Sequence, residues 1–159
     1  MTSVGPFPPS PPGSVRGEVP LSFRIGLNAM VGLLGLQFLL GMAVNLYVAP
    51  SVLPSSLLQA LGPGATSSPW MVTAHVYVGA ALGVLALALL PWSLRVSPGR
   101  VFGGCVAGAV GVFVAAVAGA AYLADSRAAD ASYAMAVGFL VAFWAFFWTR
   151  VQGERTRGV

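Results

Sequence analysis

The sequence predicts an all-α membrane protein in which four transmembrane helices form a bundle. Of its 159 residues, 57% are hydrophobic and only 8% are charged, which is too little charge to cover the surface of a soluble domain. The charges are also clustered, because Asp, Glu, Lys and Arg are absent from residues 25–94, 101–124 and 131–149. Apolar stretches of at least about 18 residues are typical of transmembrane helices.

The first 20 residues are rich in Pro, Gly and Ser and lack apolar periodicity. Such a composition buries too little apolar surface to order itself, so we expect residues 1–20 to be a disordered tail. The PFPPSPP stretch within this tail also suits a polyproline helix presented to a partner, which is the less favoured alternative. The first span is expected at residues 22–48. Its apolar run exceeds the core of a cleavable signal peptide, about 7–15 residues, which indicates a retained helix.

The linker between the first two spans, residues 49–69, contains signals for a short helix. Ser56 and Gln59 have the spacing of a capping box, and Gly62 followed by Pro63 supplies a stop. We therefore expect a short interfacial helix within residues 55–61 in the first outer loop. An uncharged loop element at the membrane surface is the simpler interpretation, and a lid over the bundle is the alternative.

The remaining spans are expected at residues 70–92, 99–123 and 131–148. Trp70 and Trp92 bracket the second span, as aromatic residues do at membrane interfaces. Asp130 stands at the N-cap position of the last span. Residues 151–159 are polar and are expected to form a fraying tail. The transmembrane domain thus covers residues 21–150.

The arginines predict the orientation of the four spans in the membrane. With four spans, Arg127 lies on one side of the membrane, and all the other arginines lie on the opposite side. These are Arg16, Arg24, Arg95, Arg100, Arg150, Arg155 and Arg157. The positive-inside rule then places both termini in the cytoplasm, and we expect the bacterial cytoplasmic membrane as the location. The spread of arginines over tails and a short loop argues against nucleic-acid binding.

Small residues recur at helical spacing in three of the expected spans. The sets are Gly79 with Gly83, Gly104 with Gly108, Gly111 with Ala115 and Gly119, and Gly32 with Gly35 and Gly41. Such stripes let helix backbones approach in lipid, which predicts a tightly packed bundle. Association of two copies through one stripe remains the alternative. The expected partners are therefore the lipid bilayer and either a homo-oligomer or a larger membrane complex.

His75 is the only histidine of the chain and lies in the second span. Gly79 and Gly83 follow it at i+4 and i+8, so His75 shares their face and should point into the bundle. At 1.5 Å per residue it lies roughly 6–8 Å from the outer end of the span. Two interpretations stay open. A neutral imidazole could bond to Asn45, Tyr77 or a backbone carbonyl, or His75 could ligate haem b or copper.

A possible pocket can be located by comparing depths along the spans. Met42, Asn45 and Met135 are expected near the level of His75, with Gly119 making room. A methionine would then supply the second soft donor to a metal ligated by His75. Gln37, Gly41 and Asn45 are spaced by four, so an amide-bearing face of the first span should reach the same region. The candidate cofactor-binding residues are Gln37, Met42, Asn45, His75 and Met135, with His75 the candidate metal ligand.

Two stretches carry a resemblance to known proteins, GLQFLLGMAVNLYV at 35–48 and HVYVGAALGVLALA at 75–88. They resemble small four-span bacterial membrane proteins of unassigned function and, more distantly, one half of a haem A synthase. That family pairs a glutamine-x-x-x-glycine helix with a helix led by a histidine, which Gln37, Gly41 and His75 match. The resemblance implies a haem-facing position for His75. It does not imply haem A synthesis, because Ala134 stands where the second histidine of that family would be.

The sequence offers little that suggests catalysis or transport. No Ser, His and acid meet in one outer-leaflet constellation, and the spans hold no paired carboxylates and no acid for proton coupling. The single cysteine, Cys105, allows no internal disulfide. We therefore expect a non-enzymatic accessory or structural component of a membrane. The alternatives are a cytochrome-like redox protein that binds haem through His75 and, less favoured, a small transporter or channel.

Overall fold

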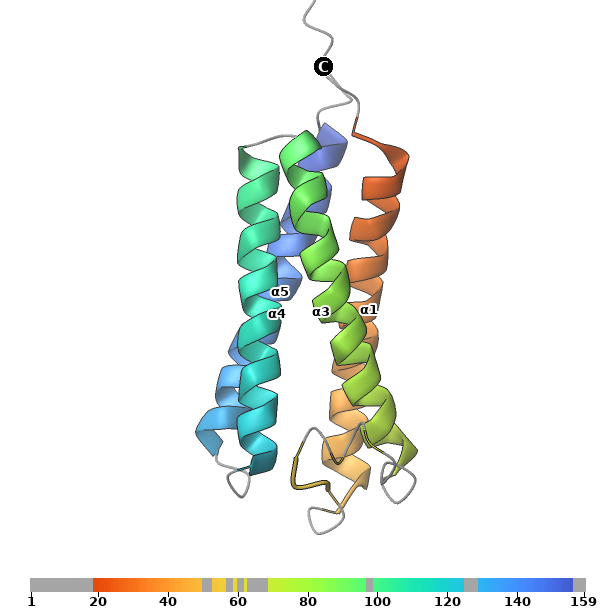
Figure 1. Ribbon diagram of the computed structural model, residues 1–159, viewed down its shortest axis with the longest axis vertical. Helices are drawn as coiled ribbons and strands as arrows, with labels where there is room; N and C mark the ends of the chain where they lie inside the picture. Colours follow the sequence, from red (N-terminus) through yellow and green to blue (C-terminus); the bar gives the residue numbers. More distant parts are fainter. Residues whose placement is uncertain are drawn as a thin grey trace, which may run out of the picture.

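The computed structural model describes residues 19–49, 53–56, 59, 62, 69–96, 99–124 and 129–155 of the chain. These residues contain four long helices and no strand: α1 (Leu21–Tyr47), α3 (Trp70–Val96), α4 (Arg100–Ala124) and α5 (Ala129–Arg155). The helices lie along a common axis, with the start of α1 and the end of α5 at the same end of the bundle (Figure 1). Each is long and apolar enough to cross a membrane. The predicted all-α architecture of four candidate membrane helices is confirmed.

Two helices extend further than the sequence pattern predicts. The helix α3 continues through Pro91 to Val96, and α5 continues to Arg155. A helix satisfies its own backbone hydrogen bonds, so it can leave the hydrocarbon layer and continue where polar residues begin. The burial of Thr149 and Gly153 also gives the end of α5 a packed face. The expected fraying tail is therefore helical as far as Arg155, and residues 156–159 lie outside the described residues.

Two predicted helix caps differ in detail from the structure. Because α5 begins at Ala129, Asp130 lies in its first turn and is not the N-cap. Its carboxylate still faces the positive end of the helix dipole. In the linker between α1 and α3, the backbone amide of Gln59 donates to Ser56 Oγ at 3.2 Å, as in the predicted capping box. The Gln59 side chain, however, accepts from the backbone and hydroxyl of Ser55 at 2.9 and 3.0 Å. The other residues of the predicted short interfacial helix, and residues 1–18, lie outside the described residues.

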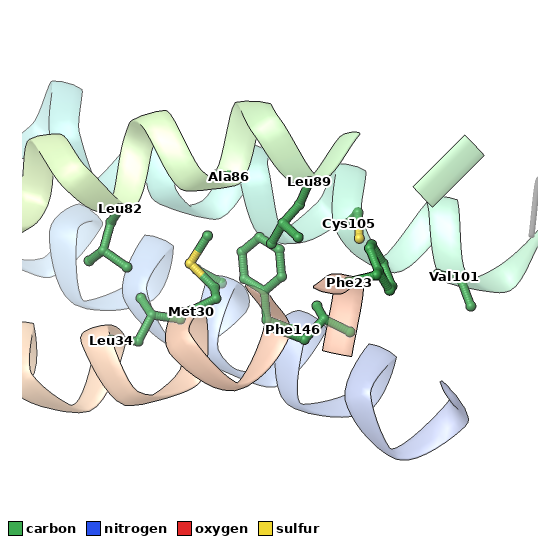
Figure 2. Packing of buried hydrophobic residues seen from close by; sticks show 11 residues of the cluster. Phe23, Met30, Leu34, Leu82, Ala86, Leu89, Val101, Cys105 and Phe146 are labelled. Atoms are coloured by element: carbon green, nitrogen blue, oxygen red, sulfur yellow. The ribbon is translucent and has the colours of Figure 1, made fainter. Parts of the chain in front are cut away.

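A buried hydrophobic cluster lies in the half of the bundle that contains the start of α1. Side chains from all four helices meet there, with Phe146 of α5 among residues of α1 and α3 (Figure 2). The cluster consists of Phe23, Leu27, Met30, Leu34, Leu82, Ala86, Leu89, Val101, Cys105, Ala142 and Phe146. This half therefore ties the α1–α3 pair to the α4–α5 pair. Towards the end that carries Tyr47 and Trp70, the two pairs separate (Figure 1).

The helices α4 and α5 pack with their backbones in contact. A Cβ atom added to Gly111 would lie 2.6 Å from the backbone nitrogen of Ala142, and one on Gly138 would lie 2.7 Å from that of Ala115. One on Gly108 would meet the ring of Phe146 at 2.5 Å. The predicted use of the α4 glycines for close packing is confirmed. Their partner Gly138 is not identified by the sequence analysis, although Ala142 follows it at i+4 as a small-residue stripe requires.

Candidate functional site

A hydrogen bond between two polar side chains joins α1 to α3. Gln37 Nε2 of α1 lies 3.2 Å from His75 Nε2 of α3, across 38 residues of sequence. Both residues are half-buried, and both lie in segments apolar enough to cross a membrane. The prediction that His75 points into the bundle is confirmed. Its partner is Gln37, however, and not Asn45, Tyr77 or a backbone carbonyl.

Two glycines make the room that this pair needs. A Cβ atom on Gly41 would lie 3.2 Å from His75 Cε1, and one on Gly79 would lie 3.2 Å from Gln37 Nε2. Each glycine follows a member of the pair by four residues, so it shares that residue's helix face. The contact is therefore reciprocal. The histidine of α3 packs on the glycine of α1, and the glutamine of α1 packs on the glycine of α3. We call Gln37, Gly41, His75 and Gly79 the Gln–His clamp.

The hydrogen bond uses only part of the bonding capacity of the two side chains. With the amide nitrogen of Gln37 as the donor, His75 Nε2 accepts, and the ring proton resides on Nδ1. Gln37 Oε1 and His75 Nδ1 are both buried and have no hydrogen-bond partner within the described part of the chain. Rotating the amide would exchange donor and acceptor and would again leave one polar atom on each residue unsatisfied. The clamp thus holds the helices together while retaining two unsatisfied polar atoms.

The other predicted site residues do not join this contact. Met42 is 42% exposed, and Asn45 is also exposed, both on α1. The sulfur of Met135 on α5 lies 3.5 Å from the Cβ position of Gly119 on α4, so this glycine makes room for the Met135 side chain. On α1, the residue that lies at the same level as His75 is Gln37. Asn45 lies eight residues further along, about 12 Å at 1.5 Å per residue, which places it beyond the reach of the imidazole.

The geometry of His75 bears directly on cofactor binding. Its Nε2 is engaged by Gln37, and its Nδ1 is buried, 3.6 Å from the Cβ position of Gly41. Both ring nitrogens therefore lie against α1, and neither is open for axial ligation in this arrangement. Among the described residues, no group of three or more His, Cys, Asp and Glu side chains is placed to hold a metal ion. The clamp as it stands does not fit haem or copper.

Two further polar side chains, Ser93 and Thr149, are buried near the ends of α3 and α5 and were not predicted as interior residues. Ser93 donates to the carbonyl of Leu90 at 2.7 Å, and Thr149 donates to the carbonyl of Ala145 at 2.7 Å. Both are almost fully buried, at 0% and 1% exposure. Each lies one residue beyond the predicted end of its span, and therefore outside the expected transmembrane segment. A serine or threonine next to an apolar run is the signal that would have found them, because its hydroxyl can bond to its own helix.

Comparisons of the chain with protein-family models, with curated proteins and with solved structures find no match. These comparisons therefore do not support the resemblance to small bacterial membrane proteins or to haem A synthase.

Proposed function

We propose that this protein is a non-enzymatic accessory or structural component of a membrane, which acts through helix–helix contacts within the bilayer. The observation that carries this proposal is the Gln–His clamp. The only imidazole of the chain is bonded to Gln37 of a neighbouring helix at 3.2 Å. Intramembrane polar groups are costly and mark either function or helix association. Here the geometry favours helix association.

We further propose that both termini face the cytoplasm of a bacterial cell. Arg24, Arg95, Arg100 and Arg150 belong to the end of the bundle that holds the start of α1 and the end of α5 (Figure 1). Asp130 belongs to the opposite end. Positive charge concentrated at one end favours that end as cytoplasmic. Arg127, the exception in the sequence pattern, lies outside the described residues.

The competing function is a haem-binding redox protein with His75 as the axial ligand. One observation favours it: the buried Nδ1 of His75 has no hydrogen-bond partner within the described residues. The Gly41 backbone next to Nδ1 and the Gln37 bond at Nε2 oppose it. Ligation through either nitrogen requires the contact between α1 and α3 to open.

The two functions differ in an optical spectrum. The protein is purified in mild detergent from haem-replete cells, and its visible spectrum is recorded in oxidised and reduced form. We expect no Soret band from the wild type. A Soret band that is present in the wild type and in Asn45→Leu, but lost in His75→Ala, would establish the haem-binding alternative.

The accessory role is tested on the same preparation. We expect the protein to elute in mild detergent as a homo-oligomer or with a constant partner protein. Mass spectrometry of the eluted complex and its measured mass distinguish these two forms. A strictly monomeric preparation without a partner would contradict the proposed role.

A further inference from the structure

The face of α1 that points away from the other helices carries an asparagine within an apolar segment. Asn28 is exposed, and its side chain makes no hydrogen bond within the part of the chain that the structure describes. With α1 centred in a hydrocarbon layer about 30 Å thick, Asn28 lies about 9 Å from the midplane, because it is six residues from the central Leu34. An asparagine side chain is too short to reach back about 6 Å to the headgroups, as an arginine would.

The glycines of α1 divide between two faces of the helix. Cβ atoms on Gly26 and Gly41 would contact α3, at 3.0 Å from Leu89 and 3.2 Å from His75. Cβ atoms on Gly32 and Gly35 would have no atom within 4 Å. At about 100° per residue, Gly32 and Gly35 lie within about 40° of Asn28 around the helix. The exposed amide and the two open glycines form one surface, which we call the Asn28 face.

Other exposed surfaces of the bundle differ from the Asn28 face in their chemistry. Midway along α3 and α4 the exposed residues are apolar, for example Val84, Leu87, Val110 and Phe113. Acyl chains solvate such side chains well. Acyl chains offer no hydrogen bond to an amide, so an exposed amide is stabilised when another protein helix in the membrane supplies one. The Asn28 face combines this unmet polar group with backbone that another helix can approach closely.

We propose that the Asn28 face is the contact surface between two copies of this chain, an inference that rests on the proposed function and names its partner. All copies insert in one orientation, so a two-fold axis along the membrane normal brings α1 against α1 in parallel. Asn28 then meets Asn28 at the same depth. A carboxamide both donates and accepts, so the two amides can bond to each other reciprocally. Gly32 and Gly35 allow the two backbones to approach closely.

Cysteine cross-linking in membranes tests the geometry. Leu39 is 64% exposed and lies within about 20° of Asn28 around α1. Val110 of α4 is 55% exposed and serves as the matched control on another helix. In a Cys105→Ala background, oxidation with copper phenanthroline should cross-link Leu39→Cys into dimers and leave Val110→Cys largely monomeric. Equal cross-linking of the two variants, or none at Leu39→Cys, overturns the proposal.

Dimer affinity in lipid vesicles tests the role of the amide. Energy transfer between labelled copies is followed as the protein is diluted with lipid. Asn28→Leu should weaken dimerisation about tenfold, because two interhelical hydrogen bonds are lost. Asn45→Leu removes an exposed amide from the far end of the same helix and should have no effect. Wild-type dimerisation in Asn28→Leu would overturn the proposal.

The outcome for the wild type separates this inference from the proposed function. A wild-type protein that is monomeric but co-purifies with a constant different protein contradicts the dimer and supports the accessory role. A wild-type protein that is monomeric and without a partner contradicts both.

Discussion

At the scale of single residues, the Gln–His clamp shows how a polar pair is accommodated in an apolar bundle. The bond between Gln37 and His75 is flanked by Gly41 and Gly79, each of which accepts the side chain of the opposite helix. Interhelical hydrogen bonds in membranes contribute about 0.6 kcal/mol on average and at most about 1.7 kcal/mol. The clamp therefore contributes more to the register between α1 and α3 than to overall stability.

The energy of the clamp can be measured with a double-mutant cycle. Gln37→Leu, His75→Leu and the double variant are compared with the wild type by reversible unfolding in mixed detergent micelles. We expect a coupling energy of about 0.6–1.7 kcal/mol, because each single variant leaves the other polar group buried without its partner. Asn45→Leu with His75→Leu is the control cycle and should show no coupling. Purely additive effects of Gln37→Leu and His75→Leu would contradict the bond.

The accessibility of Cys105 gives a second test at this scale. Its side chain is fully buried in the hydrophobic core. We expect N-ethylmaleimide to leave Cys105 unmodified in the native protein and to modify it fully after denaturation in sodium dodecyl sulfate, as measured by mass spectrometry. Rapid modification of the native protein would show that this part of the core opens.

The direction of His75 could be predicted from the sequence, but its partner could not. Helical spacing alone places His75 on the face of Gly79, and that prediction is confirmed. The choice between Gln37 and Asn45 depends on how far α1 is shifted along α3. This shift is set by the packing of both helices in the core, which spacing within one helix does not determine. Whether any of these residues binds a cofactor stays a prediction.

At the scale of helices, the α1–α3 pair and the α4–α5 pair are held together by different kinds of contact. The α4–α5 contact is made by backbone against backbone at Gly111 and Gly138. The α1–α3 contact is made largely by side chains, for example Leu89 on Gly26 and His75 on Gly41. Side chains can adjust by rotation, whereas closely packed backbones can only separate. The α4–α5 pair should therefore be the less tolerant of substitution.

This difference predicts unequal effects of adding one methyl group. In Gly111→Ala the new Cβ would lie 2.6 Å from the Ala142 nitrogen and 2.7 Å from the Gly138 oxygen, so the two helices must move apart. We expect a loss of about 1–3 kcal/mol in the free energy of unfolding, measured in mixed micelles.

The control is Gly83→Ala on α3, where a Cβ would have no atom within 4 Å. Alanine is favoured over glycine within a helix by about 0.5–1 kcal/mol, so this variant should match or exceed the wild-type stability. Equal destabilisation by Gly83→Ala and Gly111→Ala would show that the close approach of α4 and α5 does not limit substitution.

At the scale of the whole molecule, the sequence predicts the architecture well, because hydropathy and length identify membrane helices directly. It predicts their ends less well. The apolar stretches end near residues 92 and 148, whereas the helices continue to Val96 and Arg155. A helix keeps its hydrogen bonds outside the hydrocarbon layer, so a change in hydropathy marks the membrane boundary and not the end of the helix.

The proposed orientation is tested with reporter fusions. Because four spans return the chain to its starting side, a reporter after Val159 and one before Met1 should report the same compartment. We expect green fluorescent protein at either end to fluoresce and alkaline phosphatase after Val159 to be inactive. Alkaline phosphatase inserted after Ser126, between α4 and α5 in the sequence, should be active. An active phosphatase after Val159 would contradict cytoplasmic termini.

The separation of 38 positions between Gln37 and His75 also corresponds to an interval during synthesis. Ribosomes add about 5–20 residues per second, so Gln37 is made about 2–8 s before His75. When the last residue of α1 has been added, the hydrogen-bond partner of its amide has therefore not yet been synthesised. Slower translation of the linker between α1 and α3 would lengthen this interval.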